Sequence, residues 1–393
     1  MGFSFSSKKT ENIIAILDIA SGSVGGALVQ LPVNSTGIPT IISSTRTEII
    51  FQDVLDFNVF LEDMLVALDQ TVKLLNKGNT FHPSEVVCVL ASPWYLSETR
   101  VIKYSEEKPF IFTKRLANEL FEKEIKSITE MYKIKYGGSN SEPEVMEQHT
   151  MSVSLNGYTV QNPINIRTKS IDMHMILSVS PKIALEKIRK TLSNSFHTNK
   201  VSFMSFSVAS YIAVRDRYIS PDSYLLLDIS GEITDVGIVL KGILKATLSF
   251  PFGKKTIFKY MCTKLEIELR DAEELFNLHN SGIISEKYKS KLLPLFTSIE
   301  NSWSESFRQC IQTLPHTIIL PGTIFLTADT DIRSWFAKVI QNDIFIASMV
   351  TERTCNVVTL EGPEFLDMCA VKGGSCDPFL MLESIAVMRK KNP

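Results

Sequence analysis

The chain of 393 residues contains 44% hydrophobic and 21% charged residues, a composition typical of a folded globular protein with two or three domains. The 41 Lys and Arg residues nearly balance the 43 Asp and Glu residues, so no overall positive charge favours nucleic acid. The six cysteines form no C-x-x-C pair, which disfavours a zinc site or a disulfide framework. Without a secretory signal or a run of about 18 apolar residues, we expect a cytoplasmic protein that spans no membrane.

Two stretches of the sequence share one pattern. The apolar run 12–18 ends in Asp18, and a turn of small residues then leads into a second predicted strand, 24–30. The same order returns over 224–241, where an apolar run stops at Asp228 before a glycine-containing turn and another strand. A repeated unit of strand, acid, turn and strand predicts an α/β fold of two lobes with a cleft between them.

Between these two units the pattern predicts more of the first lobe and then a separate module. A helix is expected over 54–76 and a buried strand over 85–91. An α+β module, assigned to residues 84–180, then interrupts the lobe. Its expected elements are strands 97–104, 151–155 and 171–179, and a helix that Thr113 caps and that extends to about residue 132.

The second half of the chain predicts further helices. Long helical periodicity covers 259–277 and 285–312, and a buried strand is expected within 317–326. The apolar helix 379–391 is interpreted as a closing core helix rather than as a membrane-surface helix. The predicted domain order is 10–83 and 181–222 for the first lobe, 84–180 for the insert, 223–258, 259–312 and 313–340 for the second lobe, and 341–393 for a return to the first lobe.

An acid at a strand end beside a turn of small residues has a chemical use. Backbone N–H groups of such a turn bind phosphate oxygens, and the carboxylate holds Mg²⁺ through water. Two such groups occur in this sequence. Asp18 is followed by a turn with Ser21, Gly22 and Ser23, and Asp228 is followed by a turn with Gly231 and Thr234. Asp also stabilises ordinary hairpin turns, so each motif alone is weak.

The motifs DIASGSVG (18–25) and DISGEITD (228–235) resemble the phosphate hairpins of the actin-like ATPase superfamily, which read close to D-x-G-[ST] and D-x-G-G-G-x-T-D. The module with turns at 156–157 and 162–163 looks like the SHS2-type subdomain of the FtsA and PilM proteins. The resemblance implies a two-lobed actin-like, ribonuclease H-like α/β fold with Mg-ATP between the lobes. The implied nucleotide residues are Asp18, Ser21, Gly22, Ser23, Asp228, Gly231, Thr234, Asp235, Glu273, Thr327 and Ala328, with Asp18 and Asp228 holding Mg²⁺ through water.

Several positions depart from the family pattern in the direction of a lost site. Ala20 replaces a glycine, Gly25 stands where a phosphate-contacting lysine is expected, and Ser230 and Glu232 replace glycines of the second hairpin. A carboxylate at Glu232 is expected to repel a triphosphate. The A-E-x-x-K motif lacks its lysine at 272–276, and the adenosine glycines are replaced by bulkier residues at 326–330. The sequence leaves a functional and a decayed site equally open and names no catalytic residue.

What the resemblance implies for function is a scaffold at the inner face of the membrane, either in cell division or in type IV pilus assembly. Its partners are expected to be proteins of that machine, with self-association left open. The competing hypothesis is an active ATPase or ATP-dependent kinase with a working Mg-ATP site between the lobes.

Overall fold

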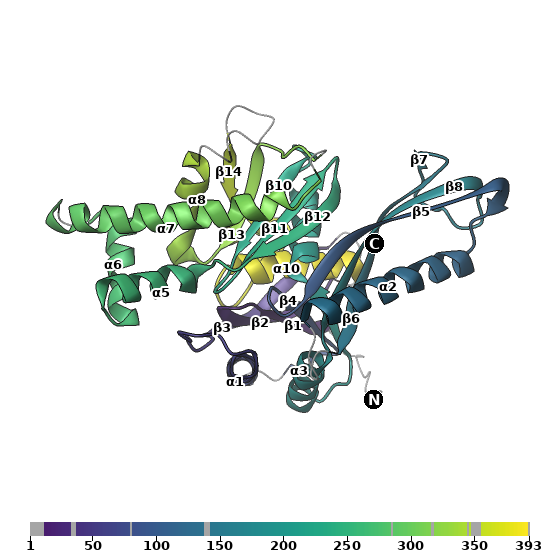
Figure 1. Ribbon diagram of the computed structural model, residues 1–393. Helices are drawn as coiled ribbons and strands as arrows, with labels where there is room; N and C mark the ends of the chain where they lie inside the picture. The colour runs from purple at the N-terminus through teal and green to yellow at the C-terminus, as the bar shows by residue number, and fades with distance from the viewer. Residues whose placement is uncertain are drawn as a thin grey trace, which may run out of the picture.

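The computed structural model describes residues 12–32, 37–78, 81–136, 142–283, 286–315, 318–343, 346 and 355–391. These residues form two lobes, each built on a sheet, and a third sheet that projects to one side of the first lobe (Figure 1). The N-terminal residues up to 11 and residues 137–141 lie outside the described residues. In the described part, no helix is both long and apolar enough to cross a bilayer.

The first lobe contains a mixed sheet of six strands. In spatial order they are β15 (Ala370–Val371), β3 (Thr40–Glu48), β2 (Ser23–Gln30), β1 (Ile13–Ile19), β4 (Val86–Leu90) and β9 (Val201–Ser205). One face is covered by α1 (Phe57–Asn76) and α3 (Lys182–Phe196), whose apolar side chains meet those of β1 and β4. Strand β4 falls within the range 84–180 assigned to the insert, yet it pairs in parallel with β1 and β9.

The second lobe repeats this design with five strands. They are, in spatial order, β12 (Ile243–Phe250), β11 (Thr234–Leu240), β10 (Tyr224–Ile229), β13 (Thr323–Ala328) and β14 (Asn356–Thr359). Its outer face is covered by α5 (Lys254–Leu265), α6 (Leu269–Asn280), α7 (Glu286–Gln312) and α8 (Thr330–Asn342). Two helices carry the helical periodicity predicted over 259–277, because the chain breaks after α5 where Glu266 adopts a left-handed conformation (φ 54°).

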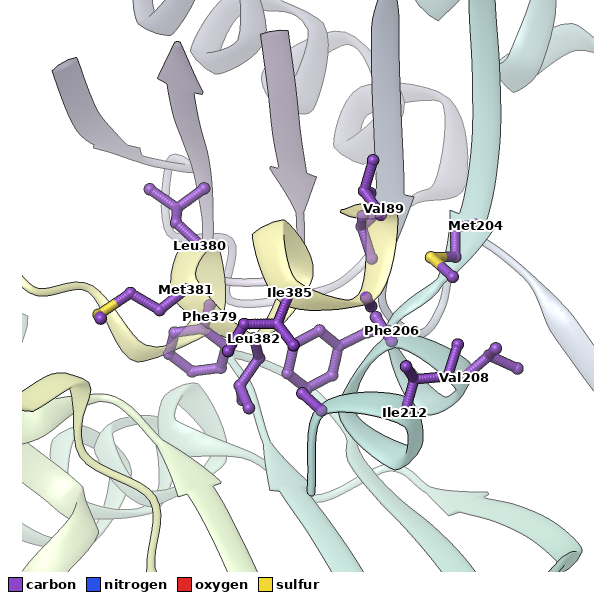
Figure 2. Close-up of a cluster of buried hydrophobic side chains, with 14 of the residues drawn as sticks. Val89, Met204, Phe206, Val208, Ile212, Phe379, Leu380, Met381, Leu382 and Ile385 are labelled. Atoms are coloured by element: carbon purple, nitrogen blue, oxygen red, sulfur yellow. The ribbon is translucent and has the colours of Figure 1, made fainter. Parts of the chain in front are cut away.

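Two helices lie between the lobes and join their cores. These are α4 (Phe206–Arg217) and α10 (Pro378–Lys391), beside the short 3₁₀ helix η1 (Gly362–Phe365). Figure 2 shows Phe206 of α4 and Phe379 of α10 in the same apolar cluster, and their ring centroids are 5.6 Å apart. Helix α10 is buried continuously from Phe379 to Met388. The prediction that this helix closes the core is therefore confirmed, and burial on all sides is the reason.

The insert forms its own antiparallel sheet with one helix. The strand order is β5 (Leu96–Ile111), β8 (Arg167–Pro181), β6 (Pro143–Leu155) and β7 (Tyr158–Thr159), and α2 (Lys114–Tyr136) packs on this sheet. Thr113 caps α2 as predicted, since its hydroxyl accepts the N–H of Leu116 at 3.2 Å. The α+β character of the insert is confirmed, and its sheet extends away from the lobes in Figure 1.

Candidate functional site

The two predicted hairpins form with matching registers. Asp18 on β1 lies opposite Gly25 on β2, and Asp228 on β10 lies opposite Asp235 on β11. Each turn is closed by the same kind of bond: the N–H of Ala20 donates to the Ser23 carbonyl at 3.1 Å, and that of Ser230 donates to the Ile233 carbonyl at 3.0 Å. The repeated sequence pattern therefore folds into a repeated local structure, one copy in each lobe.

The two turns touch each other across the lobe boundary. A Cβ placed on Gly231 would lie 2.5 Å from the Gly22 Cα, closer than any real Cβ contact. The Ser21 and Ser230 hydroxyls are hydrogen-bonded at 2.7 Å, and the N–H of Glu232 donates to the Ser21 hydroxyl at 2.9 Å. The gap between the turns does not admit a methyl group, so in this arrangement it does not admit a phosphate.

Asp18 is held by an arginine of the same lobe. Arg46, on β3, donates to the Asp18 carboxylate at 2.7 Å, to the Ser23 hydroxyl at 2.9 Å and to the Asp377 carboxylate at 2.8 Å. Asp18 is only 1% exposed. Burial raises the pKa of Asp18 above its ordinary value, and Arg46 opposes that rise. A Cβ at Gly25 would lie 2.7 Å from the Arg46 guanidinium, so the arginine fills the space that a longer side chain at position 25 would need.

Two further buried carboxyl groups lie near Asp18. Asp228 keeps its Oδ1 without a hydrogen-bond partner among the described residues. Burial, followed by the nearby charges of Asp235 and Asp18, raises the pKa of Asp228 well above its ordinary value. Burial and the charge of Asp18 likewise raise the pKa of Glu383, on α10, well above its ordinary value. Both shifts favour the neutral acid, which is a poor ligand for Mg²⁺.

The remaining residues of the second hairpin are bound within the protein. Thr234 donates its hydroxyl to the Phe252 carbonyl at 2.6 Å. Asp235 accepts the Ser92 hydroxyl at 2.6 Å, which links the second lobe to the first, and burial raises the pKa of Asp235 to about 6. Glu232 pairs with Lys259 at 3.0 Å. The predicted repulsive carboxylate is therefore compensated by a lysine of the same protein.

The residues predicted for the adenosine side lie at the end of β13. Thr327 is buried and donates to the Leu227 carbonyl at 3.2 Å, while the carbonyl of Ala328 accepts from Arg333 at 3.2 Å. Just beyond them, the Asp329 carboxylate forms an ion pair with the Lys254 ammonium at 3.2 Å. The groups that replace the family's glycines thus form contacts of their own.

A cavity of about 520 Å³ opens beside the touching turns. It is lined by Gly22, Gly231, Lys254, Lys255 and Glu273, among others. Glu273 therefore lines the same cavity as Gly22 and Gly231 of the two turns. Lys255 is only 7% exposed and donates to the backbone carbonyl of Ile49, in the first lobe, at 3.1 Å. The two lysines of this wall are thus used in contacts within the chain.

The residues present do not fit a magnesium phosphate group between the hairpins. The turns are in contact, Arg46 takes the Asp18 carboxylate, and the pKa of Asp228 favours its neutral form. Among the described residues near the hairpins, Asp228 Oδ1 and both carboxyl oxygens of Glu383 have no hydrogen-bond partner, and burial raises the pKa of both groups. We therefore assign no chemical step to Mg-ATP in this arrangement.

Sequence reasoning missed the residues that fill the site. Arg46 was not singled out, although it is the only Lys or Arg between Lys9 and Lys73. An isolated cation of this kind is a signal for a buried ion pair. Asp377 and Glu383 carry no such signal, because they reach the hairpin only through the folding of α10 against β1.

Comparison with solved structures identifies the class of fold. The chain has the actin-like ATPase fold. It is similar to a chain of the PilM–PilN type IV pilus biogenesis complex, with a TM-score of 0.56 and 13% identity over 95% of this chain and 96% of that one. A weaker likeness links it to the ethanolamine utilization protein EutJ from Carboxydothermus hydrogenoformans, with a TM-score of 0.44 and 10% identity over 95% and 89% of the two chains. No protein-family model and no curated protein matches the sequence.

Proposed function

We propose that this protein is an actin-like scaffold of the PilM type, which works by binding another protein of a membrane-associated machine rather than by hydrolysing ATP. The observation that supports this proposal is the contact between Gly22 and Gly231, which closes the space between the two phosphate hairpins. In an ATPase of this fold, that space is where backbone N–H groups would bind phosphate. Here one of those N–H groups, that of Glu232, instead donates a hydrogen bond to the Ser21 hydroxyl.

A structural argument supports protein binding as the role. The lobes are joined by direct bonds, from Lys255 to Ile49 and from Ser92 to Asp235, so their relative position does not depend on a nucleotide between them. The insert adds a sheet that extends away from both lobes (Figure 1). We interpret this insert as SHS2-like. The PilM structure that resembles this chain is a complex with PilN, and we extend that kind of partnership to this protein.

The proposed setting is the cytoplasmic face of the inner membrane, with a type IV pilus assembly protein as partner. The sequence motifs also fit a role in cell division, but the structural likeness to PilM favours the pilus machine. The alternative function, an active ATPase or kinase, is favoured by one observation: the cavity of about 520 Å³ beside the turns, with the free Oδ1 of Asp228 close to the hairpins.

Coexpression with a PilN-type protein tests the proposal. We expect the two proteins to copurify in the presence of a chelator and without added nucleotide. Copurification only with Mg-ATP would favour the ATP-dependent alternative. Failure to copurify under either condition would contradict the scaffold role in pilus assembly.

A further inference from the structure

We propose that the segment between β3 and α1, together with the outer face of α1, is a docking surface for a basic amphipathic helix of a partner protein. We call it the acidic apolar surface. It is defined by the exposed side chains Ile50, Asp53, Val54, Leu55, Phe57 and Val59, and it continues along α1 to Val66. The proposal goes beyond the pilus role and stands on this surface alone.

The apolar part of this surface is unusual for a protein exterior. All residues from 53 to 59 are exposed, and four of these seven are large and hydrophobic. Val54 is 85% exposed and Ile50, just before them, is 61% exposed. Single exposed apolar residues are common and need no explanation, but a group of this kind marks an interaction site. We infer that a partner covers it.

The charges on this surface have one sign. The 26 residues from 47 to 72 contain six Asp and Glu residues and no Lys, Arg or His. Asp53, Asp56 and Asp63 form no ion pair with any residue that the structure describes. Asp56 instead caps α1, accepting the N–H groups of Asn58 and Val59, and Asp63 accepts the Gln52 amide at 2.5 Å. Their negative charge is therefore left for a partner.

The lysines that other elements bring near this region are already engaged. Lys187 of α3 pairs with Glu62, and Lys73 pairs with Asp69 at 2.6 Å. Lys259 of α5 pairs with Glu232, while its ammonium also lies 5.6 Å from the centroid of the Phe51 ring. Burial lowers the pKa of Lys255, on α5, and the nearby charge of Asp63 is among those that oppose this shift, but the Lys255 ammonium donates to the backbone carbonyls of Ile49 and Ile50. None of the three aspartates of the segment forms an ion pair with a described residue.

The shape of the surface indicates a helical partner. Val59 and Val66 are seven residues apart on α1, which places them on one stripe two turns apart. Glu62 lies between them on the same exposed face. A partner helix can lie along this stripe with apolar side chains against the valines and Lys or Arg side chains beside the acids. In Figure 1, α1 lies below the first sheet, while the strands of the insert extend away to the right.

Other occupants fit the charges less well. An anionic lipid surface would be repelled by uncompensated aspartates. A second copy of this chain, related by a twofold axis, would bring the same acids against one another, because such an interface uses one patch on both subunits. A segment with apolar anchors and Lys or Arg side chains matches both features of the surface.

A designed peptide tests the inference on the full chain. The probe is a fluorescent amphipathic helix of about 14 leucine and lysine residues, and its counterpart carries glutamate in place of lysine. We expect the lysine peptide to bind with an affinity that falls as salt is raised, and the glutamate peptide not to bind. The double variant Val54→Ser/Phe57→Ser should weaken binding about tenfold or more, which corresponds to losing two apolar anchors.

Two further variants separate the contribution of the acidic side chains from that of exposed apolar side chains in general. Asp53→Asn/Asp63→Asn should weaken binding and flatten its salt dependence. Ile134→Ser, which removes an equally exposed apolar side chain from α2, should leave binding unchanged. All altered side chains are on the surface, so the variants are expected to fold like the parent.

Four results would overturn the inference: no binding of the lysine peptide to the parent chain, equal binding to the Val54→Ser/Phe57→Ser variant, equal binding of the glutamate peptide, or equal loss in Ile134→Ser. A dimer of the parent chain that dissociates in Val54→Ser/Phe57→Ser would also overturn it, because a second copy would then occupy the surface. Binding to a PilN-type protein is scored separately, so the two proposals fail independently.

Discussion

Replacing Arg46 by alanine tests the ion pair that fills the first hairpin. Arg46 is the cation that contacts the buried Asp18 carboxylate, and it also binds Asp377 and Ser23. Its removal leaves Asp18, which is 1% exposed, without a positive partner. Breaking a buried pair in this way costs about 3–5 kcal/mol, because one charge remains buried and uncompensated. Arg46→Ala should therefore destabilise the protein strongly although it removes no apolar core.

This cost converts into a measurable shift of the thermal midpoint. A chain of 393 residues, at about 2.1 cal/mol/K per residue, has an entropy of unfolding of about 0.8 kcal/mol/K. A loss of about 3–5 kcal/mol then lowers the midpoint by about 4–6 °C. Trp94 donates its indole N–H to the Ala20 carbonyl at 3.0 Å, so its fluorescence reports on the hairpin in a variant where Trp303 and Trp335 are replaced by Phe. Calorimetry measures the global transition in the same samples.

The pH dependence of the loss identifies its cause. The pKa of Asp18 is already raised by burial, and removing Arg46 takes away the charge that lowers it. A raised folded-state pKa means that stability is present at low pH and is lost as pH rises through that pKa. The deficit of Arg46→Ala should therefore be smaller at about pH 5 than at about pH 8, and Asp18→Asn in the same background should recover part of it.

A surface ion pair provides the control for this experiment. Arg115 and Glu119 form an exposed pair on α2, so Arg115→Ala should cost about 0.5 kcal/mol or less. The reasoning is refuted if Arg46→Ala lowers the midpoint no more than Arg115→Ala does. A deficit that stays constant with pH would refute the assignment of the cost to Asp18.

Two further predictions concern the second hairpin. Gly231→Ala places a Cβ 2.5 Å from the Gly22 Cα and should cost about 1–3 kcal/mol in thermal unfolding, whereas Gly237→Ala, whose Cβ would lie 3.3 Å from the Leu226 Cβ, should cost less. Equal effects of the two substitutions would argue against contact between the turns. Burial raises the pKa of Asp235 from 3.8 to about 6, so this group removes about 3 kcal/mol of stability as pH rises from about 4 to above 6. Asp235→Asn should abolish that part of the pH profile, and parallel profiles of variant and parent would contradict the assignment.

The parts of the fold that the sequence predicts are those determined by local pattern. The runs ending in Asp18 and Asp228 predict two hairpins because an apolar run, an acid and a turn of small residues act over a few neighbouring positions. The break between α5 and α6 was missed, because Glu266 carries no local signal for its left-handed conformation. A residue without glycine's freedom takes that conformation here through the packing of the two helices on the second sheet.

The sequence singled out residues of both turns but did not indicate how the turns are arranged. The sequence singled out Ser21, Gly22 and Gly231, and the structure brings them together. It did not indicate that the turns touch, or that Arg46 joins Asp18 to Asp377, which lies 331 positions further along the chain than Arg46. Contacts between such distant positions depend on how α10 and the two sheets pack, and no periodicity or spacing records them.

The thermal midpoint of the parent protein with and without millimolar Mg-ATP tests the central claim most directly. A ligand that binds only the native state at about 100 times its Kd adds about 2.7 kcal/mol, which for this chain is a rise of about 3 °C. With the Gly22 and Gly231 turns in contact, we predict no change in the midpoint. A rise of that size, lost in Asp228→Ala, would show a working nucleotide site and would contradict the account.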